Sequence, residues 1–141
     1  MFCDWRSVSF YLPLSAQVLP VKNLIVWDKI SGPGNFYTLQ HELIIFSTFN
    51  NKFHAKRATN VIRSPGFSSG VKKTNGGKIH PTQKPVELIE IFLSHATKPG
   101  YTVLDCFMGS GTTGVACVRN NRNFIGMELQ EKYFEIAKNR I

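Results

Sequence analysis

Two carboxylates accompany a glycine-rich stretch in the last third of the chain. Asp105 stands directly before this stretch, and Glu128 follows at the end of the next apolar run. Gly109, Gly111 and Gly114 satisfy the pattern G-x-G-x-x-G, which lets the backbone turn sharply and lets a ligand approach where a Cβ would block it. A carboxylate in the place of Glu128 can accept hydrogen bonds from ribose hydroxyls. The spacing therefore predicts a site for an adenosine-containing ligand, without saying which one.

Asp105 distinguishes between the adenosine-containing ligands. A carboxylate directly before the glycine turn would repel the pyrophosphate of a dinucleotide. S-adenosylmethionine carries no phosphate but has a sulfonium and an ammonium group, and a carboxylate attracts both. A phosphate-binding P-loop is excluded because the turn lacks the G-K-[ST] ending. We therefore predict S-adenosylmethionine as the ligand. The alternative that stays open is an Asp105 that only caps the turn through local hydrogen bonds.

A parallel βαβα unit is expected to position these groups, because strand-length apolar runs alternate with helical patterns. In chain order the unit consists of a strand at 101–105, a helix at 112–118, a strand at 123–128 and a helix at 131–140. A further helix begins at Pro85, where a proline needs no hydrogen-bond partner for its nitrogen. Its apolar stripe over 86–96 predicts that it packs on the sheet.

The first part of the chain has the pattern of a second group of strands. Apolar runs of strand length lie at 23–28 and 42–49, and we expect them to be neighbours in one sheet. Shorter extended pieces are expected at 1–5 and 60–63. Residues 7–21 show a weak helical pattern that two prolines interrupt.

The positive charge of the chain is concentrated in one segment. Seventeen Lys and Arg against nine acidic residues give a net charge of +8, and the stretch 43–86 contains no acidic residue. Such a segment can neutralise phosphates and release their counterions, although a solvated loop that merely keeps the protein soluble would look the same. The neighbouring motifs favour nucleic acid. The predicted contacts are Lys52, Lys56, Arg57, Arg63, Lys72, Lys73 and Lys78.

Composition limits the class of protein further. The 141 residues, 43% of them hydrophobic, suffice for one domain with a core. No apolar run of about 18 residues occurs, so no membrane span is expected. Cys3, Cys106 and Cys117 lack the spacing of metal ligands, so no metal site is predicted. We interpret all three as small, half-buried side chains in a reducing, cytoplasmic setting.

Two motifs in a fixed order resemble a known family. His80-Pro-Thr-Gln-Lys-Pro85, followed by the predicted helix and by Asp105-Cys-Phe-Met-Gly-Ser-Gly-Thr-Thr113, is similar to the N6-adenine and N4-cytosine DNA methyltransferases. The order matches the subgroup whose catalytic half precedes its cofactor half. Weaker similarity extends over 2–6, 26–29 and 126–128. The resemblance implies an α/β, Rossmann-like methyltransferase sheet, S-adenosylmethionine as cofactor and a base flipped out of double-stranded DNA, with adenine favoured over cytosine.

Carried over by position, the resemblance gives individual residues a role. The implied cofactor-binding residues are His80, Thr82, Lys84, Asp105, Phe107, Gly109, Ser110, Gly111, Thr112 and Glu128. Glu128 would hold the ribose, and Lys84 would pair with the methionine carboxylate of the cofactor. Phe36 or Tyr37 would lie near the flipped base. From the residues alone, Lys84 could be an ordinary surface lysine at the start of a helix, and His80 could equally be a capping or packing histidine. The two aromatics could be part of the core.

The family's catalytic motif does not occur in this sequence. Members activate the amino group with an Asp-Pro-Pro-Tyr-type motif, and none is found in the 141 residues, so no catalytic residue is predicted. We therefore expect an incomplete sheet that lacks the central catalytic strand, and an N-terminal methyltransferase fragment as a partner. A non-catalytic DNA- or cofactor-binding remnant and a dinucleotide-binding protein stay open as alternatives. The predicted organisation is a partial substrate-side half at 1–49, a basic target-recognition loop at 50–79 and a cofactor-binding half at 80–141.

Overall fold

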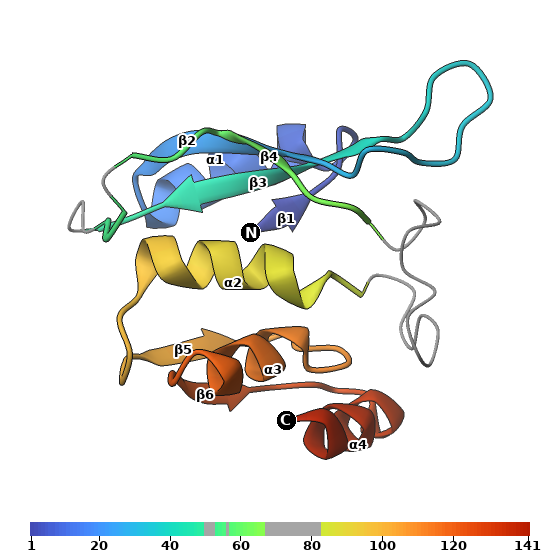
Figure 1. Ribbon diagram of the computed structural model, residues 1–141. Coiled ribbons are helices and arrows are strands. Elements are labelled where there is room, and N and C mark those ends of the chain that lie inside the picture. Colours follow the sequence, from blue (N-terminus) through green and yellow to red (C-terminus); the bar gives the residue numbers. More distant parts are fainter. Residues whose placement is uncertain (50–52, 56, 67–82) are drawn as a thin grey trace. The chain divides into compact units, whose positions relative to one another are not determined.

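The computed structural model divides the chain into two compact units, and each is described here by itself (Figure 1). The first unit comprises Met1–Lys52 and Lys56–Lys72, and the second comprises Phe53–Ala55 and Lys73–Ile141. The structure describes residues 1–49, 53–55, 57–66 and 83–141. The sequence predicts three segments, 1–49, 50–79 and 80–141, each defined by an expected function. These functions stay predictions.

The first unit is a mixed four-stranded sheet with one helix. Its strand order is β1-β3-β2-β4, in which β3 runs antiparallel to β1 and β2, and β4 runs parallel to β2. The bounds are β1 Phe2–Cys3, α1 Val8–Val18, β2 Val21–Asp28, β3 His41–Ser47 and β4 Val61–Arg63. The expected pairing of the two long apolar runs is confirmed. Trp27 anchors the core of this unit, where its buried indole N–H donates to the Ser64 carbonyl at 2.8 Å.

Helix α1 forms although its sequence pattern is weak. It contains Pro13, which removes one intrahelical hydrogen bond. The turn before the helix is fixed by Ser7, whose hydroxyl donates to the Asp4 carboxylate at 2.7 Å. None of the eleven residues of α1, all of them described, is buried or charged, and Phe10 and Val18 are 63% and 81% exposed. Contacts with β2 and β3 therefore hold α1 on the sheet without burying a complete face of it.

The second unit contains the predicted parallel βαβα arrangement. In chain order it consists of α2 Val86–Ala96, β5 Thr102–Asp105, α3 Thr112–Arg119, β6 Asn123–Gly126 and α4 Glu131–Arg140. Strands β5 and β6 pair in parallel, which confirms the prediction. In the described part of the chain β5 has no other strand partner, as expected for an incomplete sheet. The prediction that the second strand continues to Glu128 is wrong, because β6 ends at Gly126. Its partner β5 ends at Asp105, whose carbonyl accepts a hydrogen bond from the Met127 N–H, so no residue of β5 is left to pair with Glu128.

A tripeptide from the connection between β3 and β4 belongs to the second unit. The His54 N–H donates to the His95 carbonyl, at the end of α2, at 2.8 Å. The His54 ring meets the Tyr101 ring edge-on at 5.7 Å between centroids, and the Phe53 ring lies 5.3 Å from the His95 ring. The chain therefore leaves the first unit at residue 53 and returns to it at residue 56.

The cysteines differ from their interpretation as half-buried side chains. Cys3 and Cys117 are buried, and this burial raises the pKa of both thiols. Cys106 is exposed, because it lies in the loop that follows β5. Of the helices that the structure describes, none is long and apolar enough to cross a membrane. The described His, Cys, Asp and Glu side chains form no group of three that could hold a metal ion.

Candidate functional site

The loop between β5 and α3 is shaped by glycines and by its own hydrogen bonds. Gly109 and Gly111 have φ angles of 54° and 80°, a left-handed conformation that glycine adopts without strain. The Gly111 N–H donates to the Met108 carbonyl at 2.8 Å, and the Met108 N–H donates to the Met127 carbonyl at 2.9 Å. The predicted sharp turn is therefore confirmed, and it is tied to the chain that follows β6.

The space left by two of the glycines is filled by the protein itself. A Cβ on Gly111 would lie 2.8 Å from the Cβ of Ala137 and 3.1 Å from Cδ1 of Ile141. A Cβ on Gly114 would collide with Ile141 and with the Phe124 ring. The interpretation that these glycines make room for a ligand is wrong at both positions. They make room for α4 and β6, so the loop and α3 pack directly on these elements.

Asp105 is half-buried at the end of β5, and both of its carboxylate oxygens accept hydrogen bonds. Oδ1 accepts from the Phe107 N–H at 3.0 Å and Oδ2 from the Thr113 hydroxyl at 2.6 Å. These are the local contacts of the turn-capping alternative. Each carboxylate oxygen retains a second lone pair, and the negative charge stays at the start of the loop. Selection of a cationic ligand by this charge therefore stays a prediction that the geometry permits.

Glu128 joins the same loop from the other side. Its Oε2 accepts a hydrogen bond from the Gly109 N–H at 3.0 Å, and its Oε1 accepts one from the Gln130 N–H, directly before α4, at 2.9 Å. Asp105 and Glu128, which are far apart in the sequence, are thus connected through a single glycine turn. The structure places two carboxylates at the carboxyl ends of β5 and β6, where open parallel sheets bind their ligands.

An open hollow of about 330 Å³ lies beside this loop. It is lined by Cys106, Phe107, Met127, Glu128 and Leu129. Phe107 is 91% exposed and Leu129 is 100% exposed, so these apolar side chains are available to a ligand. Apolar walls around one carboxylate suit a ligand in which a flat ring is joined to a group with hydroxyls.

Sequence reasoning missed part of this lining. Cys106, Met127 and Leu129 were given no role in binding, although all three lie in the two turns that follow β5 and β6. The signal that could have found Met127 and Leu129 is that these apolar residues flank Glu128, beyond the end of the strand. Such residues are exposed, because no strand or helix is left to cover them.

Other residues of the predicted cofactor set lie elsewhere. Ser110 and Thr112 are 2% and 7% exposed, and the Ser110 hydroxyl faces Arg140 of α4 instead of the hollow. Lys84 is half-buried shortly before α2. His80 and Thr82 lie outside the described residues.

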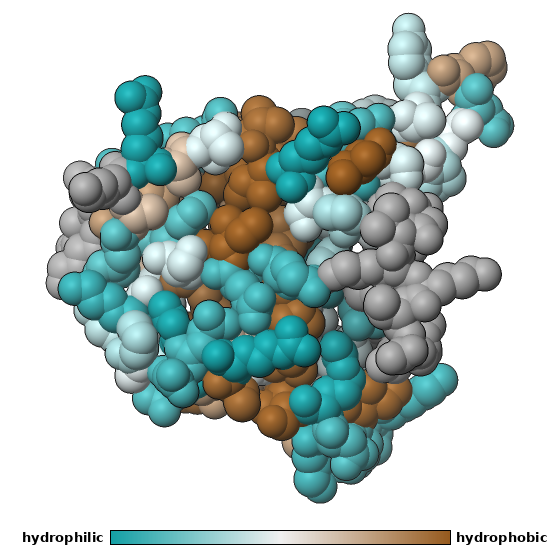
Figure 2. Space-filling view, in the orientation of Figure 1, coloured by the Kyte–Doolittle hydropathy of each residue, from teal (hydrophilic) through white to brown (hydrophobic). Residues whose placement is uncertain are grey.

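The predicted flipped-base residues stand in the loop between β2 and β3, which projects from the first unit (Figure 1). Phe36 and Tyr37 are 97% and 91% exposed, so the alternative that they belong to the core is wrong. Figure 2 shows apolar and polar groups side by side on this projecting loop, at the upper right of the view. The two rings are therefore available for stacking.

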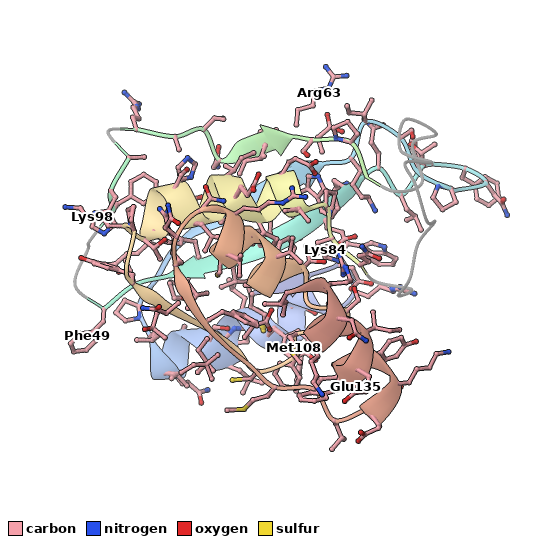
Figure 3. The ribbon with its side chains drawn as sticks, turned by 60° about the horizontal axis from the view of Figure 1, so that its bottom comes forward. Phe49, Arg63, Lys84, Lys98, Met108 and Glu135 are labelled. Atoms are coloured by element: carbon pink, nitrogen blue, oxygen red, sulfur yellow. The ribbon has the colours of Figure 1, made fainter. Side chains whose placement is uncertain are left out.

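The described members of the predicted nucleic-acid contacts are both exposed. Arg57 is exposed, and the Arg63 side chain is 70% exposed and points away from the ribbon (Figure 3). The Arg63 guanidinium lies 3.6 Å from the Asp28 carboxylate. Hydrogen bonds from the Gln40 side chain and from the Ile30 N–H lower the pKa of Asp28, which keeps this partner charged. The contacts outside the described residues are Lys52, Lys56, Lys72, Lys73 and Lys78.

The chain is similar to known proteins along most of its length. A family model described as "DNA methylase", N6_N4_Mtase, matches residues 14–139. The chain is 34% identical over 137 residues to the type II methyltransferase M2.MboI of Moraxella bovis and 33% identical over 147 residues to M2.DpnII of Streptococcus pneumoniae. These matches cover 85% and 92% of this chain but 49% and 54% of the two relatives. The chain therefore spans about half the length of these curated relatives.

A solved structure extends the similarity to the fold. The crystal structure of an M1.HpyAVI–SAM complex superposes with a TM-score of 0.76 at 37% sequence identity. The superposition covers 99% of this chain and 71% of that one.

Proposed function

Because the chain belongs to the DNA methylase family N6_N4_Mtase, we propose that it binds S-adenosylmethionine and takes part in methylating an exocyclic amino group of DNA. One observation carries this proposal. Asp105 and Glu128, which follow two parallel strands, both accept hydrogen bonds from backbone N–H groups of one glycine turn, and Glu128 lines the apolar hollow beside it. The related structure that was solved with S-adenosylmethionine supports the same ligand.

The chemistry of these residues fits this cofactor. The Asp105 carboxylate suits its sulfonium and ammonium groups, and the Glu128 carboxylate suits its ribose hydroxyls. Phe107 and the other apolar side chains of the hollow would shield the adenine from water. Lys84, together with His80 and Thr82, is proposed to hold the methionine carboxylate. When bound, the cofactor supplies a methyl group on a positively charged sulfur.

Double-stranded DNA is the proposed substrate. The basic segment 50–79 would follow the phosphates, and the exposed rings of Phe36 and Tyr37 would stack near the flipped base. Adenine N6 is proposed over cytosine N4, from the resemblance of the motifs ending at Pro85 and beginning at Asp105. A DNA substrate together with free thiols fits action in the cytoplasm.

The groups that activate the amine are proposed to come from an N-terminal methyltransferase fragment, since these 141 residues contain no Asp-Pro-Pro-Tyr-type motif. The competing function is a DNA- or cofactor-binding remnant without activity. Mixing the chain with such a fragment, labelled S-adenosylmethionine and DNA separates the two. Transfer of label to adenine supports the enzyme, whereas cofactor binding without transfer supports the remnant.

Calorimetry tests the proposed ligand. We expect S-adenosylmethionine to bind and a nicotinamide dinucleotide not to bind, because Asp105 repels a pyrophosphate. Bound cofactor should also slow alkylation of Cys106, since this exposed thiol lines the hollow. Buried Cys3 and Cys117 provide the internal control, because ligand should leave their slow alkylation unchanged. Tight dinucleotide binding without S-adenosylmethionine binding would overturn the proposal.

DNA affinity should fall steeply with salt, because phosphate contacts release counterions. Arg63→Gln should reduce the slope of log affinity against log salt by about 1. Arg6→Gln is the matched control, because Arg6 is 71% exposed against 70% for Arg63 and is likewise paired with an aspartate, but lies outside the basic segment. Filter binding over a range of salt concentrations gives both slopes. Equal slopes for the two variants would exclude a phosphate contact at Arg63.

A further inference from the structure

Arg140, in the last turn of α4, reaches back to the glycine loop. Its Nη1 donates to both oxygens of Ser110, the backbone carbonyl and, at 2.9 Å, the hydroxyl. Ser110 is only 2% exposed, so these contacts lie inside the protein. Burial lowers the pKa of Arg140, but a guanidinium keeps its charge in a protein. Hydrogen bonds donated by a charged group to buried acceptors are among the stronger ones.

Two neighbours of Arg140, one within α4 and one directly after it, pack against the same loop. Ala137 and Ile141, on either side of Arg140, occupy the space that a side chain on Gly111 would need. Ser110 is preceded directly by Gly109, whose N–H donates to the Glu128 carboxylate. Ser110, which accepts hydrogen bonds from Arg140, thus lies between the two glycines whose conformations shape the turn.

We infer that Arg140 is a positioning residue, which holds Ser110 and thereby keeps the Gly109–Gly111 turn in the conformation that binds the cofactor. This inference rests on the proposed function of the loop. The described hydrogen bonds of Arg140 go to Ser110, which does not line the hollow, so the guanidinium acts on the ligand site through the backbone. Removal of the guanidinium should therefore make the turn more mobile and weaken the hydrogen bond between the Gly109 N–H and the Glu128 carboxylate.

Two substitutions of Arg140 separate its hydrogen bonds from its packing. Arg140→Met keeps an apolar stem and removes all donors, whereas Arg140→Lys keeps a charged donor. The control is Lys138→Met on the same helix, because it also removes one positive charge. The Lys138 side chain is 65% exposed and lies 3.6 Å from Glu135, which is labelled in Figure 3.

Arg140→Met should raise the dissociation constant for S-adenosylmethionine about tenfold, and Arg140→Lys should keep it within about threefold of the unchanged protein. Lys138→Met should leave the constant unchanged. DNA affinity should be equal in Arg140→Met and Lys138→Met. If Arg140 had a merely structural role, its substitution would lower the affinity for both S-adenosylmethionine and DNA. The contrast between the two affinities therefore tests the positioning role.

Hydrogen exchange gives a readout that needs no ligand. The Gly109 N–H donates to the Glu128 carboxylate and the Gly111 N–H donates to the Met108 carbonyl. Arg140→Met should speed exchange of both amides about tenfold or more relative to amides of β5 and β6. Unchanged exchange at both glycines in folded Arg140→Met would overturn the inference. Should the unchanged protein fail to bind S-adenosylmethionine, the proposed function fails, while this exchange measurement still decides the role of Arg140.

A milder variant covers the case in which Arg140→Met does not fold. Ser110→Ala removes only the hydroxyl acceptor, so it should speed exchange at Gly111 by about threefold. Ser7→Ala, which removes a hydroxyl in the turn before α1, is the control and should leave exchange at Gly111 unchanged. Unchanged exchange at Gly111 in folded Ser110→Ala would contradict the inference.

Discussion

Asp105→Asn is expected to raise the dissociation constant for S-adenosylmethionine at least tenfold, about 1.4 kcal/mol, in a protein that stays folded. Asparagine keeps an oxygen that can accept from the Phe107 N–H, and its amide can donate to the Thr113 hydroxyl, so the local hydrogen bonds survive. What is lost is the negative charge that attracts the sulfonium and the ammonium group. Calorimetry measures the affinity, and circular dichroism checks the fold.

Thr113→Val is the control for this substitution. It removes the hydrogen bond to Asp105 and keeps the charge, so the affinity should stay within about threefold of the unchanged protein. The two results together separate the electrostatic role of Asp105 from its role in capping the turn. Unchanged affinity in a folded Asp105→Asn variant would leave capping as its only role.

Gly111→Ala destabilises the protein by about 3 kcal/mol, the second large effect that we expect. Two costs add at this position. A φ of 80° is strained for alanine, and its Cβ would lie 3.0 Å from Cα of Ala137, a backbone atom that cannot move aside on its own. Urea unfolding measures the loss of stability.

Gly100→Ala separates the two costs. Gly100 has nearly the same φ, 83°, but a Cβ there would meet nothing within 4 Å. Its substitution should therefore cost only the conformational strain, about 1 kcal/mol. The difference between the variants measures the close packing of α4 on the loop. Equal losses would mean that α4 does not pack there.

The parallel unit and the family could be predicted from the sequence because both depend on local pattern. The strand at β5, the glycine turn and the helix at α3 follow one another within a short stretch, and each has its own signal in the residue types. The family match over residues 14–139 confirms the resemblance based on two motifs, and the superposition with M1.HpyAVI confirms the α/β methyltransferase fold.

Features that depend on tertiary contacts could not be predicted in the same way. The pairing of Arg140 with Ser110 joins residues 30 positions apart and leaves no periodic trace in the sequence. The occupancy of the space beside Gly114 by Ile141 is of the same kind, since a glycine required by packing looks like one required by a ligand. Helix α1 was underestimated because Pro13 within it and Pro20 after it weaken the pattern, whereas contacts with β2 and β3 hold it in place.

The path of Phe53–Ala55 bears on how such a protein could exchange its parts during evolution. The second unit takes this tripeptide from within the sequence of the first. A recombination event that joined two genes at residue 73 would transplant α2 to α4 but leave His54 behind, and the ring of Tyr101 would lose its partner. An intact transfer needs a donor gene that matches at two separate places. The second unit is therefore not a segment that a single crossover can move intact.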